Sequence, residues 1–200
     1  MEELQQLINH IEDQLKKRQS NDALILFFRE CLHIIKAISL LKRNLSQQEQ
    51  NSAIPILTRT VFEYHINSTI LIKDSHYIHT LIYQDNQELL KFQNELPEEY
   101  RTSESQQAKE KVEQDIRKAE KQQPFYTKKF KHSIPGKLHY IDQLQSNSDN
   151  IKDGFYAVYR LLSRYTHAKI NNDSSIAESC CSFAKKVLND MLDYLQHAQV

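Results

Sequence analysis

Glycine and proline are scarce in this chain of 200 residues, which contains two glycines and four prolines. Average usage would give roughly 14 glycines and 10 prolines in this length. Sheet proteins need glycine in their tight turns, so the scarcity argues against a β-sandwich or a β-barrel. Neither glycine stands in a phosphate-binding spacing, which excludes a Rossmann fold and a P-loop. These absences favour an all-α protein.

An excess of charge and a long apolar run are lacking as well. The chain has 26 basic and 26 acidic residues, so a nucleic-acid site must be a local patch. The longest apolar run, residues 23–28, is far shorter than the roughly 18 residues of a membrane span. The start is acidic, which predicts no signal peptide. The three cysteines are in no metal-ligand spacing. We therefore expect a reduced, cytoplasmic protein without membrane contact.

Apolar residues recur at helical spacing in at least five segments. The expected helices cover residues 2–18, 23–43, 52–73, 74–96, 103–123, 135–144, 151–169 and 176–196. Ser46 and Glu49 form a predicted capping box, and Ser52 is expected to cap again, with Pro55 in the first turn that follows. The pattern shows no strand.

These segments predict one all-α domain over residues 1–200, an antiparallel helical bundle of about five core helices. Residues 98–123 are rich in Glu, Lys and Gln and carry only a thin apolar stripe, so we expect a charged helical excursion there. Residues 124–135 are expected to form a basic-aromatic loop.

One helix face between residues 156 and 167 is polar and basic. It carries Arg160, Ser163, Arg164 and His167. The opposite, apolar face carries Val158, Leu161, Leu162 and Tyr165. A histidine beside two guanidinium groups suits phosphodiester chemistry, because the histidine moves a proton and the arginines hold phosphate oxygens. The alternative is a solvated polar face with no chemistry.

Arg59 and Glu63 stand four residues apart on a helix that is otherwise apolar almost all round. Charges on such a helix need partners, so we expect a buried ion pair that fixes helix register. The functional alternative is a supporting pair that orients His167 or a phosphate.

Residues 125–141 hold the one basic run with interleaved aromatics. Its lysines are Lys128, Lys129, Lys131 and Lys137, with no acidic residue among them. Such a run can follow a nucleic-acid backbone and stack bases. The alternative is an ordinary exposed loop that its aromatic residues anchor to the bundle.

Metal and cofactor motifs are weak. Glu30 and His33 form an ExxH pair, but a di-iron bundle needs a second such pair, and the chain has none. We therefore expect neither a metal site nor a cofactor.

Arg160 and His167 match the Rx4–6H motif of HEPN domains, which this chain resembles. That resemblance implies a helical bundle that dimerises, with Arg and His from two protomers forming a metal-independent ribonuclease site. From roughly residue 20 to 195 the chain also resembles a bacterial helical family of unknown function with two motifs. One is RxxxE, here Arg59 and Glu63, and the other is SxxxH, here Ser163 and His167.

The resemblance gives the leading functional expectation: a HEPN-like RNA-cleaving or RNA-binding homodimer, acting as a toxin or anti-phage defence effector. We expect the dimer interface or its central cleft to contain the polar face at Arg160. The alternative is a non-catalytic helical interaction protein, an inhibitor or accessory subunit of a toxin–antitoxin or defence pair. Its contact surface with a protein partner would be the excursion at residues 98–123.

Overall fold

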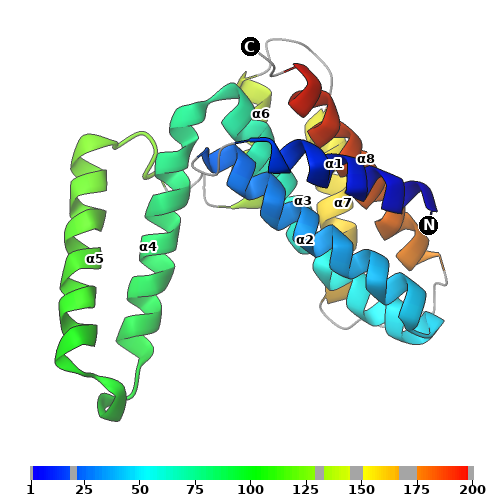
Figure 1. Ribbon diagram of the computed structural model, residues 1–200. Helices are drawn as coiled ribbons and strands as arrows, with labels where there is room; N and C mark the ends of the chain where they lie inside the picture. The colour runs from blue at the N-terminus through cyan, green and yellow to red at the C-terminus, as the bar shows by residue number, and fades with distance from the viewer. Residues whose placement is uncertain (1, 19–21, 129–132, 145–150, 167–174, 198–200) are drawn as a thin grey trace. The chain divides into compact units, whose positions relative to one another are not determined.

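The computed structural model describes residues 2–18, 22–128, 133–144, 151–166 and 175–197, and all regular structure in these ranges is helical (Figure 1). The α-helices are α1 (Glu2–Lys16), α2 (Ala23–Asn44), α3 (Gln47–Lys73), α4 (Ile78–Glu95), α5 (Ser103–Gln122), α6 (Ile134–Leu144), α7 (Ile151–Thr166) and α8 (Ile176–His197). Two short 3₁₀ helices, η1 (Ser75–Tyr77) and η2 (Glu98–Tyr100), flank α4. The expected all-α class is confirmed.

Polar side chains start several of these helices. The Asp22 carboxylate accepts a hydrogen bond from the backbone N–H of Leu24 at 2.8 Å and so caps α2. Thr102 caps α5 in the same way through the N–H of Ser105. At α3 the capping box is confirmed, because the N–H of Ser46 donates to the Glu49 carboxylate at 2.9 Å.

The second start expected for α3 is wrong. The helix begins at Gln47 and continues through Pro55 without interruption. Ser52 lies inside it and donates its hydroxyl to the carbonyl of Gln48 at 3.2 Å, so it does not cap a new helix. The capping box already forms the N-terminus of α3. The helix tolerates the loss of one backbone hydrogen bond at Pro55, because proline has no N–H.

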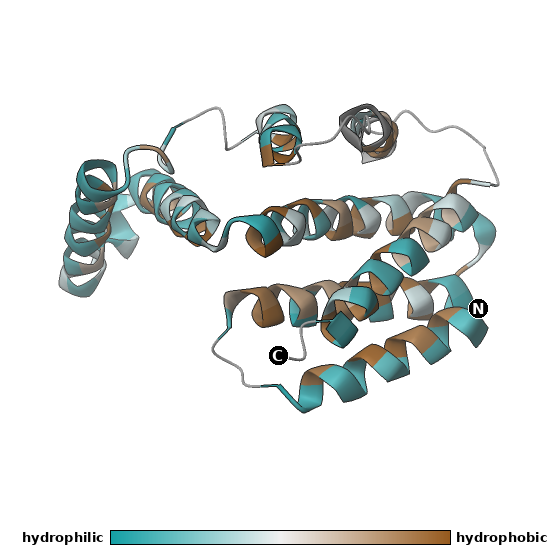
Figure 2. Cartoon of the chain, turned by 90° about the horizontal axis from the view of Figure 1, so that it is seen from above, coloured by the Kyte–Doolittle hydropathy of each residue, from teal (hydrophilic) through white to brown (hydrophobic). Residues whose placement is uncertain are grey.

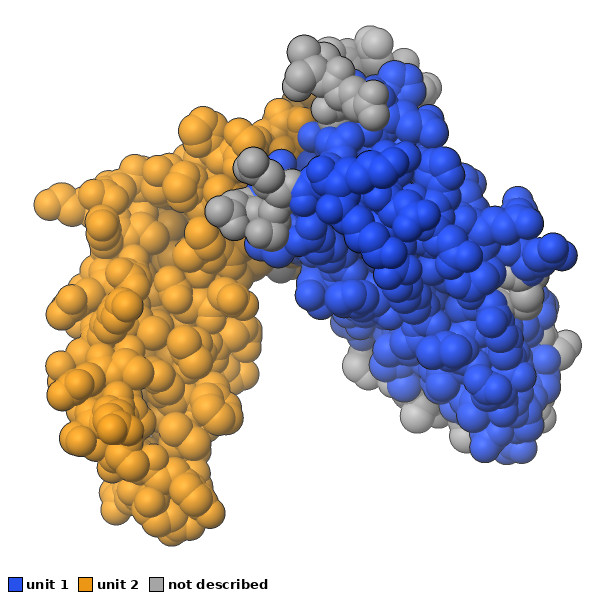
Figure 3. All heavy atoms as spheres, in the orientation of Figure 1, with its two compact units in different colours: residues 1–69, 147–200 blue, residues 70–146 orange. Residues whose placement is uncertain are grey.

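The chain divides into two compact units (Figure 3). Unit 1 comprises residues 1–69 and 147–200, and unit 2 comprises residues 70–146. Most of α3 belongs to unit 1, and its last four residues belong to unit 2. A single domain over residues 1–200 stays a prediction.

Five helices build unit 1, namely α1, α2, α7, α8 and most of α3. Side-chain contacts show the relative direction of two of them, α2 and α8. Lys42 pairs with Glu178 at 2.5 Å, and Phe28 meets Tyr194, so α2 and α8 run antiparallel. The five helices share a core of fully buried side chains that includes Leu4, Ile8, Ile11, Ile35, Ile38, Ile54, Phe62 and Ile66. This agrees with the expected bundle of about five core helices.

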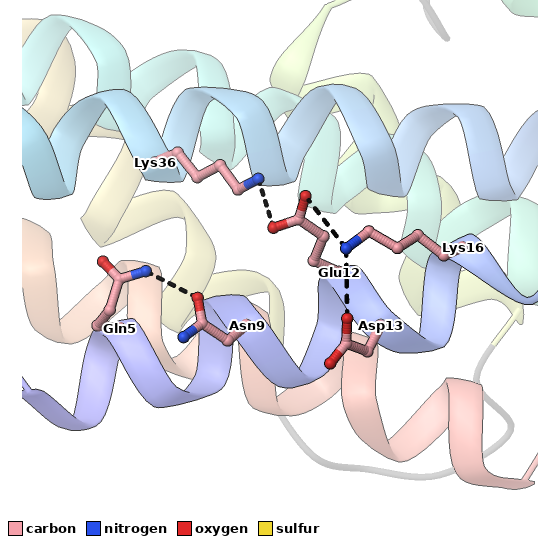
Figure 4. A network of polar contacts seen from close by, with 6 residues as sticks. All are labelled: Gln5, Asn9, Glu12, Asp13, Lys16 and Lys36. Carbon is pink, nitrogen blue, oxygen red and sulfur yellow. Dashed lines mark hydrogen bonds and ion pairs between the residues drawn. The ribbon is translucent and has the colours of Figure 1, made fainter.

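α1 closes one side of unit 1 with its apolar face, and hydrophobic and hydrophilic residues alternate along it (Figure 2). Its buried residues are Leu4, Ile8, Ile11 and Leu15. The polar edge is tied to α2, because Glu12 accepts from Lys36 at 2.7 Å and also pairs with Lys16 of α1 (Figure 4). The Lys36 ammonium holds the pKa of Glu12 below its usual range.

Helices α4 and α5 form a hairpin in unit 2 (Figure 1). Between them lie three buried side chains, Tyr83, Val112 and Ile116, with Leu90 and Ala119 packed against them. The Tyr83 hydroxyl donates to Glu120 across the hairpin at 2.7 Å. The predicted stripe on residues 98–123 therefore packs on α4, while the remainder of α5 is hydrophilic (Figure 2).

No described helix has both the length and the apolar character that crossing a membrane requires.

Candidate functional site

Helix α7 docks on α3 through aromatic rings. The ring of Phe62, fully buried on α3, lies 5.8 Å from that of Phe155 and 6.2 Å from that of Tyr159, the second in a stacked arrangement. Leu162 continues the same face of α7 and is buried. These contacts fix which side of α7 faces outward.

The polar face expected on α7 is only partly as predicted. Arg160 is exposed, but Leu161, expected on the buried side, is 43% exposed. Ser163 is half-buried, and its hydroxyl oxygen is shielded from solvent, so it is not part of an open stripe. The cause is the docking through Phe155, Tyr159 and Leu162, which turns the helix away from the face that apolar spacing favours. The side chain of Arg164 and the whole of His167 lie outside the described residues.

The Arg59–Glu63 pair forms, but it is not buried. Arg59 Nε lies 3.4 Å from Glu63 Oε1, and the side chains are 29% and 43% exposed. The expected buried ion pair is therefore wrong. The outer side of α3 is open here, because Ile56, one turn before Arg59, is 54% exposed.

Arg59 also contacts α7. Its guanidinium carbon lies 5.8 Å from the centre of the Tyr159 ring, within the range of a cation–π interaction. Tyr159 directly precedes Arg160, so the structure brings the RxxxE motif to the helix segment that carries the other predicted site residues. That proximity could not be deduced from motifs about 100 residues apart.

Together these residues make a basic and aromatic surface, which we call the α3–α7 face: Ile56, Arg59, Glu63, Tyr156, Tyr159 and Arg160. Tyr156 is 40% exposed, and its ring lies 6.4 Å from that of Tyr159. The face offers ring surfaces for stacking and two guanidinium groups, one of them partly neutralised by Glu63. Such groups suit a ligand with planar bases and phosphates.

Sequence reasoning missed His65, a buried residue of α3 that contacts α7 and α8. Its ring lies 5.6 Å from that of Phe155, and its Nε2 lies 3.4 Å from the Asp190 carboxylate. Burial lowers the pKa of His65 to about 4, with Lys186 acting in the same direction and Asp190 against it. His65 is therefore neutral near pH 7, and it serves packing rather than phosphate binding. Its contacts come from residues 90 or more positions away, so no local motif marks it.

In unit 2, Tyr126 at the start of the predicted basic-aromatic loop and Tyr140 of α6 bind the same carboxylate. The hydroxyls of Tyr126 and Tyr140 donate to Asp74 at 3.3 and 2.6 Å. Burial raises the pKa of both tyrosines, and the Asp74 carboxylate acts in the same direction. The backbone carbonyl of Tyr126 accepts from buried Thr80 at 2.8 Å. These contacts anchor the start of the predicted loop within unit 2, and residues 129–132 of the loop lie outside the described residues.

The four predicted nucleic-acid-binding lysines do not all reach the surface. Lys128 is exposed and lies 5.7 Å from the ring of Phe125. Lys137 is buried at 7% exposure, because α6 turns it inward beside Leu138 and Tyr140. Lys129 and Lys131 lie outside the described residues.

The three cysteines, Cys31, Cys180 and Cys181, are all buried and in no disulfide. Burial raises the pKa of Cys31 to about 12 and that of Cys180 to about 11. These thiols stay protonated and unreactive at neutral pH. Among the described residues, no group of three or more His, Cys, Asp and Glu side chains is placed to hold a metal ion.

A family model matches residues 21–178, more than half of the chain. The chain belongs to DUF5677, a family of unknown function. The DUF5677 match spans α2 to α7 and so includes every residue of the α3–α7 face. It agrees with the expected resemblance to a helical family of unknown function. No curated protein and no solved structure matches this DUF5677 chain at a significant level.

Proposed function

We propose that this DUF5677 protein binds single-stranded RNA on the α3–α7 face. The observation that carries the proposal is the position of Arg59 over the Tyr159 ring, beside Tyr156 and next to exposed Arg160. Proteins that bind single strands combine aromatic stacking surfaces with basic side chains along the backbone. In a chain of zero net charge, such a local combination is where a phosphate-bearing ligand would bind.

We further propose that bound RNA is cleaved without a metal, as the HEPN resemblance implies. In that reaction a histidine takes the proton of the ribose 2′-hydroxyl, whose oxygen attacks the adjacent phosphorus. The 5′-oxygen leaves and takes up a proton, while a guanidinium stabilises the charged phosphate oxygens. His167 and Arg160 are the candidates, with Arg164 and Ser163 beside them. A homodimer would bring the two copies of this face together, and a toxin or defence effector would use such activity.

Binding is tested with a fluorescent single-stranded RNA and purified protein. Arg160→Ala and Tyr156→Ala change exposed side chains and should each weaken binding by about tenfold, since one stacked base or phosphate contact is lost. Arg117→Ala on α5 removes the same charge from a side chain that is 75% exposed in unit 2, and it should leave binding unchanged. Equal losses in all three variants, or no binding by the unaltered protein, would contradict the proposal.

Cleavage is tested with the same RNA in EDTA. We expect cutting by the unaltered protein and loss in Arg160→Ala and His167→Ala. Activity that survives both substitutions, or a monomer at micromolar concentration in sedimentation, would contradict the proposed cleavage. Neither result would contradict the proposed RNA binding.

A non-catalytic interaction protein is the second candidate. The observation that favours it is the hydrophilic surface of α5, where opposite charges alternate and Arg117 pairs with Glu113 at 3.2 Å. A protein that neither binds nor cuts RNA, yet forms a stoichiometric complex through residues 98–123, would support this candidate over the first.

A further inference from the structure

One face of α4 exposes three large apolar side chains, which we call the α4 stripe: Ile82, Leu89 and Phe92. They are 53%, 44% and 60% exposed. Ile82 and Leu89 are seven residues apart and nearly eclipse, while Phe92 is three residues beyond Leu89 and lies within a turn of it. The three side chains therefore lie along one side of the helix, with Asp85 and Asn86 in the turn between Ile82 and Leu89.

The stripe is not the face that holds the hairpin together. Tyr83 and Leu90 make the contact with α5, and they lie on a different side of α4. The hairpin core itself contains three buried side chains. Exposed apolar side chains that gather on one side of a helix mark a candidate contact surface.

Acidic residues of α4 outnumber its one lysine on and beside the stripe. Asp85 lies within it, between Ile82 and Leu89, and Glu88 and Glu95 follow one edge. All three carboxylates are on exposed residues. The only Lys or Arg of α4 is Lys91, which lies half a turn from Ile82 and within one turn of both Glu88 and Glu95.

We propose that the α4 stripe is a docking site for an amphipathic helix with basic flanks, supplied by a different protein. An apolar stripe with an acidic edge is complementary to a helix that presents leucine-like side chains between lysines or arginines. This inference is independent of the proposed RNA binding, which uses residues of unit 1.

The same charges disfavour the two other occupants. A second copy of the chain would bring Asp85, Glu88 and Glu95 against identical carboxylates, and like charges in contact oppose association. A membrane surface is negatively charged at its headgroups and attracts basic amphipathic helices, not acidic ones.

The test uses the full chain and two synthetic helical peptides with the same leucine face. One peptide has lysine flanks and the other has glutamate flanks. In fluorescence anisotropy we expect the lysine peptide to bind and to weaken at high salt, and the glutamate peptide to bind about tenfold less tightly or worse.

Two variants locate the site. Phe92→Ser removes an exposed apolar side chain and should weaken the lysine peptide about tenfold. Asp85→Lys with Glu88→Lys should reverse the preference in favour of the glutamate peptide. The matched control, Glu104→Lys with Glu110→Lys, makes the same charge change at exposed residues of α5 and should keep the original preference. Circular dichroism checks that each variant is helical.

Other results overturn the proposal. These are equal binding of both peptides, a preference that the α5 control reverses as well as the α4 variant, or full binding by Phe92→Ser. A dimer of the chain that Phe92→Ser converts to a monomer would assign the stripe to a second copy. Binding to anionic vesicles that Phe92→Ser abolishes would assign it to a membrane.

Discussion

Exposure to water determines how much the ion pair between Arg59 and Glu63 contributes to stability. With 43% of the Glu63 side chain and 29% of the Arg59 side chain exposed, water solvates both groups when the pair is broken. We predict that Glu63→Ala lowers the free energy of unfolding by less than about 1 kcal/mol. Arg59 keeps its contact with Tyr159 in that variant.

Urea unfolding of the unaltered protein and of Glu63→Ala measures the difference in the free energy of unfolding. Glu12→Ala, which breaks the Glu12–Lys36 ion pair at the surface, is the control. A loss of about 3–5 kcal/mol would mean that the pair is buried after all, because that is the cost of stranding a buried charge.

His65 predicts a loss of stability in acid. Its folded pKa, about 4, lies below its ordinary value of 6.5, so the unfolded chain binds the proton more readily. The contribution of neutral His65 to the free energy of unfolding is complete above about pH 6.5, and it is lost as the pH falls toward 4. The loss is on the order of 3 kcal/mol.

Urea unfolding at pH 7.5 and pH 4.5 tests this, with His65→Gln as the variant. The acid-induced loss should shrink in His65→Gln and persist in His33→Gln, which changes an exposed histidine of α2. Equal acid sensitivity of both variants would show that other groups control it.

Most helix boundaries were predictable at the element scale, since caps and apolar spacing are local, although α3 does not begin anew at Ser52. The capping box at Ser46 and the start of α5 after Thr102 follow from a few neighbouring residues. The buried face of α7 was not predictable. Its spacing favours Leu161, yet the docked side is set by Phe155 and Tyr159 against Phe62 of α3.

The candidate site follows the same rule. Arg59, Glu63 and Arg160 could be picked out as charged residues on apolar helices. Their meeting through Tyr159 depends on tertiary packing that no motif encodes. The inward turn of Lys137 likewise depends on how α6 packs.

Helices α4 and α5 are predicted to be the least protected elements. Their shared core is three side chains, whereas α2, α3 and α8 contribute many fully buried residues to unit 1. Local opening costs less where fewer apolar contacts are broken. In native-state hydrogen exchange, amides of α4 and α5 should exchange well before those of α2 and α8.

A hairpin whose amides exchange as slowly as those of α8 would contradict this. Adding the lysine-flanked peptide should slow exchange in α4 if the α4 stripe is occupied, while the α3 amides of unit 1 provide the internal control.

At the scale of the whole molecule, zero net charge conceals an uneven distribution. The α3–α7 face carries exposed arginine and aromatic rings, whereas the α4 stripe is edged by carboxylates. Two ligands of opposite charge could therefore bind the same chain at separate places, one in each unit. Salt should weaken both proposed interactions, although their partners differ in sign.

The position of α1 has a consequence for how relatives of this chain diverge. α1 lies before residue 21, where the family match begins, and most of α8 lies beyond residue 178, where it ends. The two helices nevertheless run side by side, with Glu3 pairing with Lys185 and Arg18 donating to the carbonyl of Leu195. Substitutions in one should therefore be inherited together with compensating substitutions in the other. A relative that lost its first helix would be under selection to replace apolar residues of α8, such as Leu195, with polar ones.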